Sequence, residues 1–205
     1  MQLTWHGLAC FRMQADGATL MADPLPNGGW RGPRLAANLI ALTDRASAAT
    51  VGAPGGEPPP LVVSGPGEYE AAGILVEGAA LPRGGLHVGY RVIVGGITVV
   101  TLGMLPTPPP SDALAALTGG DVLIIPVGGG PVLTASQAAH LINVLEPRIV
   151  IPCAYRLPGL TLKLDPLEKF CREIGVCPTE TIPKLKLTRR ELPTGEMKVV
   201  VLAKT

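Results

Sequence analysis

Short apolar segments separated by glycine, proline and polar residues make up most of the first half of the chain. Segments of this length, bounded by turn residues, are typical of β-strands. Gly95-Gly96 lies between two such segments and suits the two-residue turn of a β-hairpin. The stretch 50–60, TVGAPGGEPPP, is predicted to be a loop because its prolines lack amide donors and its glycines are costly to order. We therefore predict strands at 2–5, 10–13, 19–22, 38–43, 61–64, 74–81, 87–94 and 97–103.

The second half of the chain alternates between helical and strand patterns. Thr134 can cap a helix whose apolar residues recur at helical spacing and which ends before Pro147. Another helix is predicted after Asp165-Pro166, with proline at its first position and Gly175 at its end. A short helix at 111–117 completes the set. The apolar face of the helix capped by Thr134 consists of Ala138, Leu141, Ile142 and Leu145.

Two continuous apolar runs, 121–127 and 148–154, have the length of strands and suit burial on both faces of a sheet. The tail, 184–192 and 196–203 on either side of a Pro-Thr-Gly turn, is predicted to form a closing hairpin. These elements add up to a strand-rich α/β fold with about eleven strands and three helices. No change of composition marks an internal boundary, so 1–205 is predicted to be a single domain.

Composition narrows the range of partners. The 205 residues include 17 basic and 16 acidic ones, so the chain has no excess of positive charge for nucleic acid and no basic stripe for an anionic membrane surface. No apolar run reaches the roughly 18–20 residues that span a bilayer, and the first residues do not read as a signal peptide. We therefore expect a cytoplasmic protein whose partner is a small molecule or another protein.

The four cysteines are Cys10, Cys153, Cys171 and Cys177. None belongs to a CxxC pair, and each lies in an apolar segment. Cysteines in such surroundings pack as small hydrophobic side chains, and cytoplasmic thiols stay reduced. The sequence therefore predicts four reduced cysteines.

Several segments, in this order along the chain, carry a resemblance to one protein family: LTWHGLACF (3–11) with TLMADP (19–24), SGPGEYEAAGI (64–74), VLIIPVGGG (122–130) and PRIVIPCAY (147–155). Together they resemble the small metallo-β-lactamase-fold hydrolases related to L-ascorbate-6-phosphate lactonases. The resemblance covers nearly the whole chain. It implies a four-layer αββα sandwich, with two sheets face to face and helices outside, and a site for two zinc or manganese ions at the sheet edge.

The main metal-binding loop of that family departs from its usual pattern here. In the family, the strand equivalent to 38–43 leads into a His-x-His-x-Asp-His loop that holds the metal ions. This chain has Asp44-Arg45-Ala46-Ser47-Ala48-Ala49 instead. Ala46, Ala48 and Ala49 therefore stand at three of the four ligand positions, and alanine has no donor atom for a metal ion.

The remaining ligand positions of the family show the same loss. Its Gly-His-Ala is Gly7-Leu8-Ala9, its Leu-Gly-Asp is Leu102-Gly103-Met104, and its Pro-Met-His-Tyr is Pro152-Cys153-Ala154-Tyr155. The last family histidine should fall near 81–83, where there is none, although His87 lies a few residues further on. The vestigial pocket implied by the resemblance is lined by Asp23, Asp44, Ala46, Ala48, Ala49, Met104, Ala154 and Tyr155.

These losses favour a degenerate member of the family, a binding or scaffolding module with no metal cofactor and no catalytic residues. An alternative is a hydrolase for a lactone, phosphoester or similar substrate with a rebuilt site, in which His6, Asp23 and Asp44 hold one metal ion. A third is a structural subunit whose partner covers the vacated edge. Cys153, next to a lost ligand position, is predicted to pack rather than react, because the sequence places no base beside it.

Overall fold

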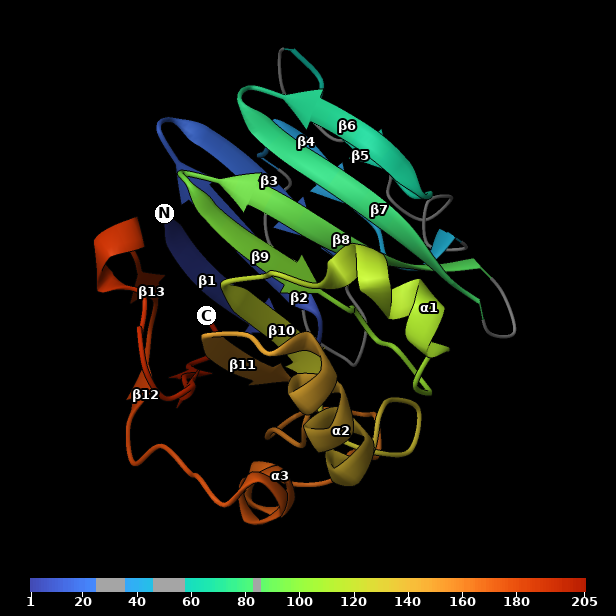
Figure 1. The fold of residues 1–205 in the computed structure, drawn as a ribbon, viewed down its shortest axis with the longest axis vertical. Helices are drawn as coiled ribbons and strands as arrows, with labels where there is room; N and C mark the ends of the chain where they lie inside the picture. Colours follow the sequence, from blue (N-terminus) through green and yellow to red (C-terminus); the bar gives the residue numbers. More distant parts are fainter. Residues whose placement is uncertain (25–35, 46–57, 83–85) are drawn as a thin grey trace.

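The fold is a sandwich of two β-sheets, seen in a computed structural model that describes residues 1–24, 36–45, 58–82 and 86–205 (Figure 1). Sheet A has the strand order β13-β1-β2-β3-β4-β5, and sheet B the order β14-β11-β10-β9-β8-β7-β6. The bounds in sheet A are β1 Gln2–Gly7, β2 Cys10–Ala15, β3 Ala18–Ala22, β4 Leu39–Ala41, β5 Leu61–Val63 and β13 Leu185–Lys186. Those in sheet B are β6 Gly67–Ala71, β7 Ile74–Pro82, β8 Leu86–Val94, β9 Ile97–Thr101, β10 Val122–Pro126, β11 Ile149–Cys153 and β14 Lys198–Val199.

The strands follow from the period of their apolar residues. In β1, Leu3 and Trp5 are almost fully buried while the alternate residues Thr4 and His6 are partly exposed, because successive side chains point to opposite faces of a sheet. Every residue of β10 and β11 is buried, as expected for parallel strands covered on both faces. The two inner faces share one hydrophobic core.

Helices cover the outer face of sheet B. They are α1 (Ser111–Leu114), continued by the 3-10 turn η2 (Ala115–Leu117), α2 (Ala135–Leu145) and α3 (Leu167–Ile174); α1 and α2 lie in front of the strands of sheet B in Figure 1, and α3 packs beside α2. Thr134 caps α2 as predicted, in a reciprocal capping box with Gln137. The strand-rich α/β sandwich expected from the sequence is confirmed, as are both longer helices and the neighbouring strands β10 and β11.

The tail does not form the predicted hairpin. β13 pairs with β1, β14 pairs with β11, and β15 (Val201–Leu202) pairs with β12 (Thr181–Ile182). The reason is that the apolar tail residues Leu185 and Leu187 are buried against the existing sheets. The strands β13 and β14 therefore complete the edges of sheets A and B, and β15 pairs in parallel with β12 in a small separate sheet.

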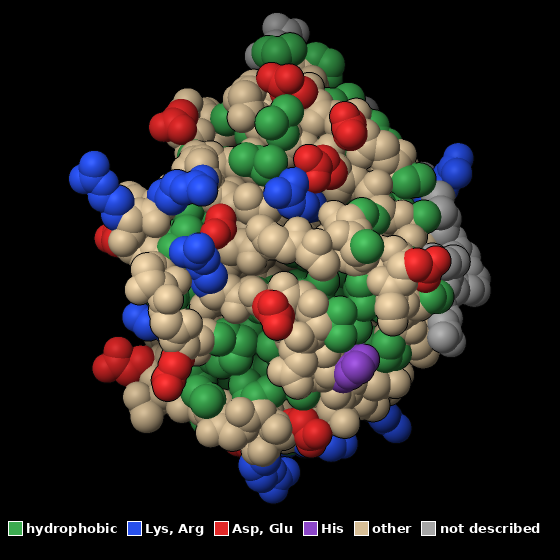
Figure 2. All heavy atoms as spheres, in the orientation of Figure 1, with side chains coloured by type: hydrophobic (Ala, Val, Ile, Leu, Met, Phe, Trp, Pro, Cys, Tyr) green, Lys and Arg blue, Asp and Glu red, His purple; other side chains and the backbone are tan. Residues whose placement is uncertain are grey.

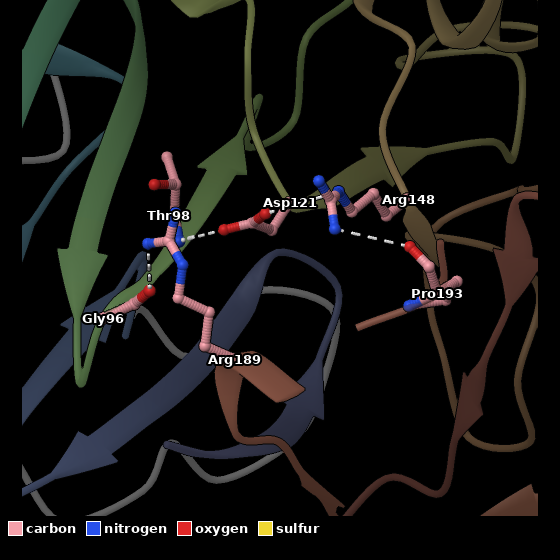
Figure 3. A network of polar contacts seen from close by, with 6 residues as sticks. All are labelled: Gly96, Thr98, Asp121, Arg148, Arg189 and Pro193. Carbon is pink, nitrogen blue, oxygen red and sulfur yellow. Dashed lines mark hydrogen bonds and ion pairs between the residues drawn. The ribbon is translucent and has the colours of Figure 1, made fainter. Parts of the chain in front are cut away.

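Polar contacts fasten this tail to sheet B (Figure 3). Arg148 lies 3.8 Å from the carboxylate of Asp121 and donates to the carbonyl of Pro193 at 3.5 Å. Arg189, in the 3-10 turn η3 (Arg189–Glu191), donates to the carbonyl of Gly96 in the β8–β9 turn at 3.4 Å. The tail is therefore attached at two separate points of the sandwich.

The surface in the same orientation mixes both signs of charge. Figure 2 shows lysine and arginine side chains interspersed with aspartate and glutamate over this face. The face presents no extended region of a single charge. Among the described residues, no helix is both long and apolar enough to cross a lipid bilayer.

The prediction of four reduced cysteines is wrong. Cys171, in α3, forms a disulfide with Cys177, whereas Cys10 and Cys153 are free and buried. The left-handed Gly175 at the end of α3 turns the chain back. This return brings the Cα atoms of Cys171 and Cys177 within 4.8 Å of each other, a separation that a disulfide can bridge.

A thiol titration checks this pairing. Denatured protein kept unreduced is expected to react with a thiol reagent at Cys10 and Cys153 alone, and reduced protein at all four cysteines. The variant Cys177→Ser is the control, because it frees Cys171 and adds one reactive thiol to the unreduced count. Equal counts with and without reductant would contradict the disulfide.

Candidate functional site

The ends of β3 and β4 bring Asp23 and Thr43 together. Asp23 follows β3, and its amide donates to the carbonyl of Ala41 in β4 at 2.9 Å. The Thr43 amide donates to Asp23 Oδ1 at 2.8 Å, and the Thr43 hydroxyl donates to Oδ2 at 2.9 Å. Both carboxylate oxygens of Asp23 therefore have partners from the same residue.

The charge on Asp23 is costly in this position. Burial raises the pKa of its carboxyl to about 7, and the nearby Asp44 adds to this rise, although the two hydrogen bonds from Thr43 act against it. Asp23 in turn raises the pKa values of Cys10 and Cys153, so the three groups lie close enough to interact electrostatically. Because Cys10 belongs to sheet A and Cys153 to sheet B, Asp23 lies at the seam between the two sheets.

A second contact closes the same seam. Asp44 forms an isolated antiparallel bridge with His87 of β8, and the Val88 amide donates to the carbonyl of Thr43 at 2.8 Å. His87 Nε2 donates to the carbonyl of Leu102 at 2.8 Å, because a carbonyl oxygen only accepts. Burial lowers the pKa of His87, so the neutral ring carries its hydrogen on Nε2.

Sequence reasoning did not place His87 at this site. The family resemblance puts a histidine near 81–83, and the register of the hairpin moves the actual imidazole to the start of β8. The sequence does contain a signal for the position of His87, namely the β8–β9 hairpin. The Gly95-Gly96 turn fixes the pairing of β8 with β9, and this pairing sets which residues of β8 lie near the end of β9.

The described residues at the lost ligand positions lie at the ends of strands along the same seam. Gly103 lies so close to Thr43 that a Cβ on Gly103 would overlap the threonine side chain, and Met104 follows directly. Ala154 follows Cys153 at the end of β11 and is fully buried. Leu8, in the turn between β1 and β2, is buried and accepts a hydrogen bond from the Trp5 indole at 2.8 Å. Ala46, Ala48 and Ala49 lie outside the described residues.

Three of these strand ends have an unusual backbone. Leu8, Asp23 and Ala154 have φ values of 47°, 43° and 50°, in the left-handed region that costs a residue with a Cβ about 1–2 kcal/mol. Residues held in this way cluster at functional sites. The backbone at these three turns therefore has a left-handed conformation that the side chains present there do not favour.

The buried thiols do not make this a nucleophilic site. Burial raises the pKa of Cys10 to about 12 and raises the pKa of Cys153 as well, so both remain protonated thiols at neutral pH. A thiol in this state is a weak nucleophile and a weak ligand. The structure thus gives Cys153 the packing environment that the sequence predicted.

His6 does not join the carboxylates. Its Nδ1 lies 2.9 Å from the hydroxyl of Thr205, and the charges that lower its pKa, after burial, are those of Arg12 and Lys204. Within the described parts of the chain, no group of three or more His, Cys, Asp or Glu side chains is arranged to hold a metal ion. His6, Asp23 and Asp44 are all described, and this structure does not bring the three side chains together.

Tyr155 also points elsewhere. Its ring lies 5.2 Å from that of Trp5, centroid to centroid, and both side chains line a separate cavity near the tail. Of the eight positions expected in the vestigial pocket, Asp23, Asp44, Met104 and Ala154 reach the seam between the sheets, whereas Tyr155 contributes to this other cavity.

A two-sheet sandwich whose strand ends meet in one seam defines the metallo-β-lactamase fold. A family model described as the β-lactamase superfamily domain matches residues 2–154, which is most of the chain. The protein belongs to this superfamily. No curated protein matches the sequence.

Solved structures share the fold at low sequence identity. A protein from Thermotoga maritima, described as a Zn-dependent hydrolase of the metallo-β-lactamase superfamily, is similar with a TM-score of 0.75 and 23% identity over 98% of both chains. Igni18, a metallo hydrolase from Ignicoccus hospitalis, has a TM-score of 0.62 and 16% identity over 91% of this chain and 99% of its own. The metallo-β-lactamase fold protein YhfI from Bacillus subtilis has a TM-score of 0.62 and 9% identity over 98% and 96%. At these identities, the likeness concerns the fold.

Proposed function

We propose that this protein is a degenerate member of the superfamily that has lost the dinuclear metal centre and acts as a non-catalytic binding or scaffolding module. Its partner is a small molecule or another protein. The observation that carries the proposal is the chemistry of the seam, where Leu8, Met104 and Ala154 occupy the strand ends at which the family resemblance places ligands. A zinc centre needs several imidazole, carboxylate or thiolate donors that converge on each ion.

The groups that remain at the seam do not fit a pair of metal ions. Asp23 has both oxygens engaged by Thr43, and the thiols Cys10 and Cys153 are buried and protonated. His87 donates from Nε2 to a backbone carbonyl, which leaves its Nδ1 as a single imidazole donor at the seam, too few for two ions. A metal-bound water becomes a nucleophile at neutral pH only when the ion is held by such donors, so we derive no hydrolytic step at this seam.

The proposal includes the cytoplasmic setting expected from the sequence. The thiols Cys10 and Cys153 do not bear on it, because they are buried and shielded from oxidants in any compartment. The Cys171–Cys177 disulfide is of a kind more common in oxidising compartments. The thiol titration described above, made on protein taken directly from cells, therefore also tests this part of the proposal.

Metal analysis tests the loss of the centre. Protein purified without added metal is expected to contain less than about 0.2 equivalents of zinc or manganese per chain, since donors for a tight site are lacking. The Thermotoga maritima protein, purified in the same way, is the positive control. The variant Ala154→His is expected to remain without metal, because one imidazole does not replace the other donors.

Two results would contradict the proposal. One is nearly two equivalents of zinc or manganese per chain, lost on substitution of Asp44 by asparagine. The other is metal-dependent turnover of a lactone or phosphodiester that the same substitution abolishes.

A further inference from the structure

A cavity of about 280 Å³ opens near the tail, away from the seam. It lies between the end of β1, the loop after β11, the first turn of α3 and the β12–β15 pair. Its walls are mostly apolar, and include Trp5, Leu167 and Leu202. This volume lies just below the roughly 300–1,000 Å³ of typical ligand pockets and suits a small molecule rather than a peptide or a nucleotide.

The hydroxyl of Tyr155 is the main polar feature of this cavity. The side chain is 6% exposed, and its hydroxyl makes no hydrogen bond to any part of the protein that the structure describes, whereas the hydroxyls of Tyr69 and Tyr90 both donate to backbone carbonyls. The oxygen of the Tyr155 hydroxyl is itself open to solvent, so it is free to donate to water or to a ligand in the cavity. Burial raises the pKa of Tyr155, and the nearby Cys153 and Glu168 add to this rise, so the hydroxyl remains a donor at neutral pH.

The charges around the cavity favour a negatively charged acceptor. Arg156 and Lys204 line it together with a single acidic residue, Glu168. Arg156 is exposed and follows Tyr155 directly, so its guanidinium is at the cavity rim. The bridge between Lys204 and Trp5 sets Lys204 beside the cavity wall.

We propose that this cavity binds a small carboxylate with an apolar body, such as an aromatic acid, whose carboxylate accepts a hydrogen bond from the Tyr155 hydroxyl and faces Arg156. The apolar body packs against Leu167 and Leu202. A carboxylate accepts from the hydroxyl in place of water, and its charge pairs with Arg156 at the rim. The proposal does not rest on the loss of the metal centre, because no residue of the seam takes part.

Titration with 4-fluorobenzoate, followed by 19F NMR, tests this site. Saturable binding is expected in the wild type, and the uncharged 4-fluorobenzamide is expected to bind at least about tenfold more weakly. Tyr155→Phe removes only the hydroxyl and is expected to weaken binding of the carboxylate about tenfold or more, the effect of a hydrogen bond to a charged group. Arg156→Gln is expected to weaken it about threefold, as for an exposed ion pair.

Controls separate a binding role from a structural one. Arg190→Gln removes an exposed arginine of the tail that is not part of the cavity wall, and is expected to leave binding unchanged. Tyr155→Phe is expected to unfold at the same temperature as the wild type or higher, because the hydroxyl it removes has no protein partner.

Three outcomes would overturn the proposal. The first is no saturable binding of 4-fluorobenzoate up to about 20 mM, because any weaker affinity is too low to be specific. The others are equal affinity for the acid and the amide, and equal binding by the wild type, Tyr155→Phe and Arg156→Gln. A failure here would leave the metal analysis unaffected. A metal-loaded protein would in turn leave this site intact, so the two proposals fail independently.

Discussion

The variant Gly128→Ala is expected to lower the free energy of unfolding by about 3 kcal/mol, the upper part of the range for overpacking a well-packed site. A Cβ at this position would overlap the carbonyl oxygen of Ala154 and approach Leu164 Cβ to 3.0 Å. The obstacle is backbone, which cannot rotate aside as a side chain can. Ala154 is itself held in the left-handed region, so a shift of its carbonyl would disturb the end of β11.

Thermal or urea unfolding measures this effect. A loss of about 3 kcal/mol corresponds to a fall in Tm of about 6–12 °C for a domain of this size. Gly195→Ala is the matched control, because Gly195 has open space around its Cβ position and no left-handed φ. If Gly128→Ala unfolded at the temperature of the Gly195→Ala variant, the close approach of the loops after β10 and β11 would be refuted.

The second large effect expected is a pH dependence that disappears in Asp23→Asn. The pKa of Asp23 is raised from 3.8 to about 7 in the folded chain. Between these values the folded state binds more protons than the unfolded state. The free energy of unfolding that depends on this group is therefore fully present below about pH 4 and is lost as the pH rises through 7. Between pH 5 and pH 8 the wild type should lose about 2 kcal/mol through this group, a figure that allows for partial exposure.

Asparagine is a suitable replacement at this position. It tolerates the left-handed φ of 43°, and its side-chain oxygen still accepts from the Thr43 amide. Relative to the wild type, Asp23→Asn should therefore gain stability between pH 5 and pH 8, as measured by urea unfolding at both values. Asp16→Asn is the control: Asp16 has a similar φ of 52° but is exposed, so its substitution should leave the difference between the two pH values unchanged. A wild-type stability that rises over this interval would contradict the assignment.

The sheets and helices were predictable because their signals are local. The apolar period of β1, the continuous runs of β10 and β11 and the cap at Thr134 all report on burial within a few residues. The tail was mispredicted for the opposite reason. The partners of β13 and β14 lie on β1 and β11, far away in the sequence, and no local pattern distinguishes a strand that pairs with its neighbour from one that completes a distant sheet.

The seam was predictable in part. The family resemblance led to Asp23, Asp44, Met104 and Ala154, which the fold brings to the same edge. Tyr155 lies apart from these residues, because the chain passes through a left-handed turn at Ala154 and the Tyr155 ring packs beside Trp5. The Cys171–Cys177 disulfide depends on a similar reversal, at Gly175. In both cases a single residue with positive φ changes the direction of the chain beyond it, which composition and periodicity do not reveal.

The position of β1 has a consequence for the order in which the chain can fold. β1 lies between β2 and β13, and Thr205 donates to the carbonyl of Trp5 at 3.0 Å. The ribosome completes β1 long before residues 185–205 emerge. Until then one side of β1 has unpaired amides and carbonyls, a template for wrong pairing with other chains. The growing chain therefore keeps an open sheet edge at β1 until residues 185–205 emerge, even after most of the core is in place.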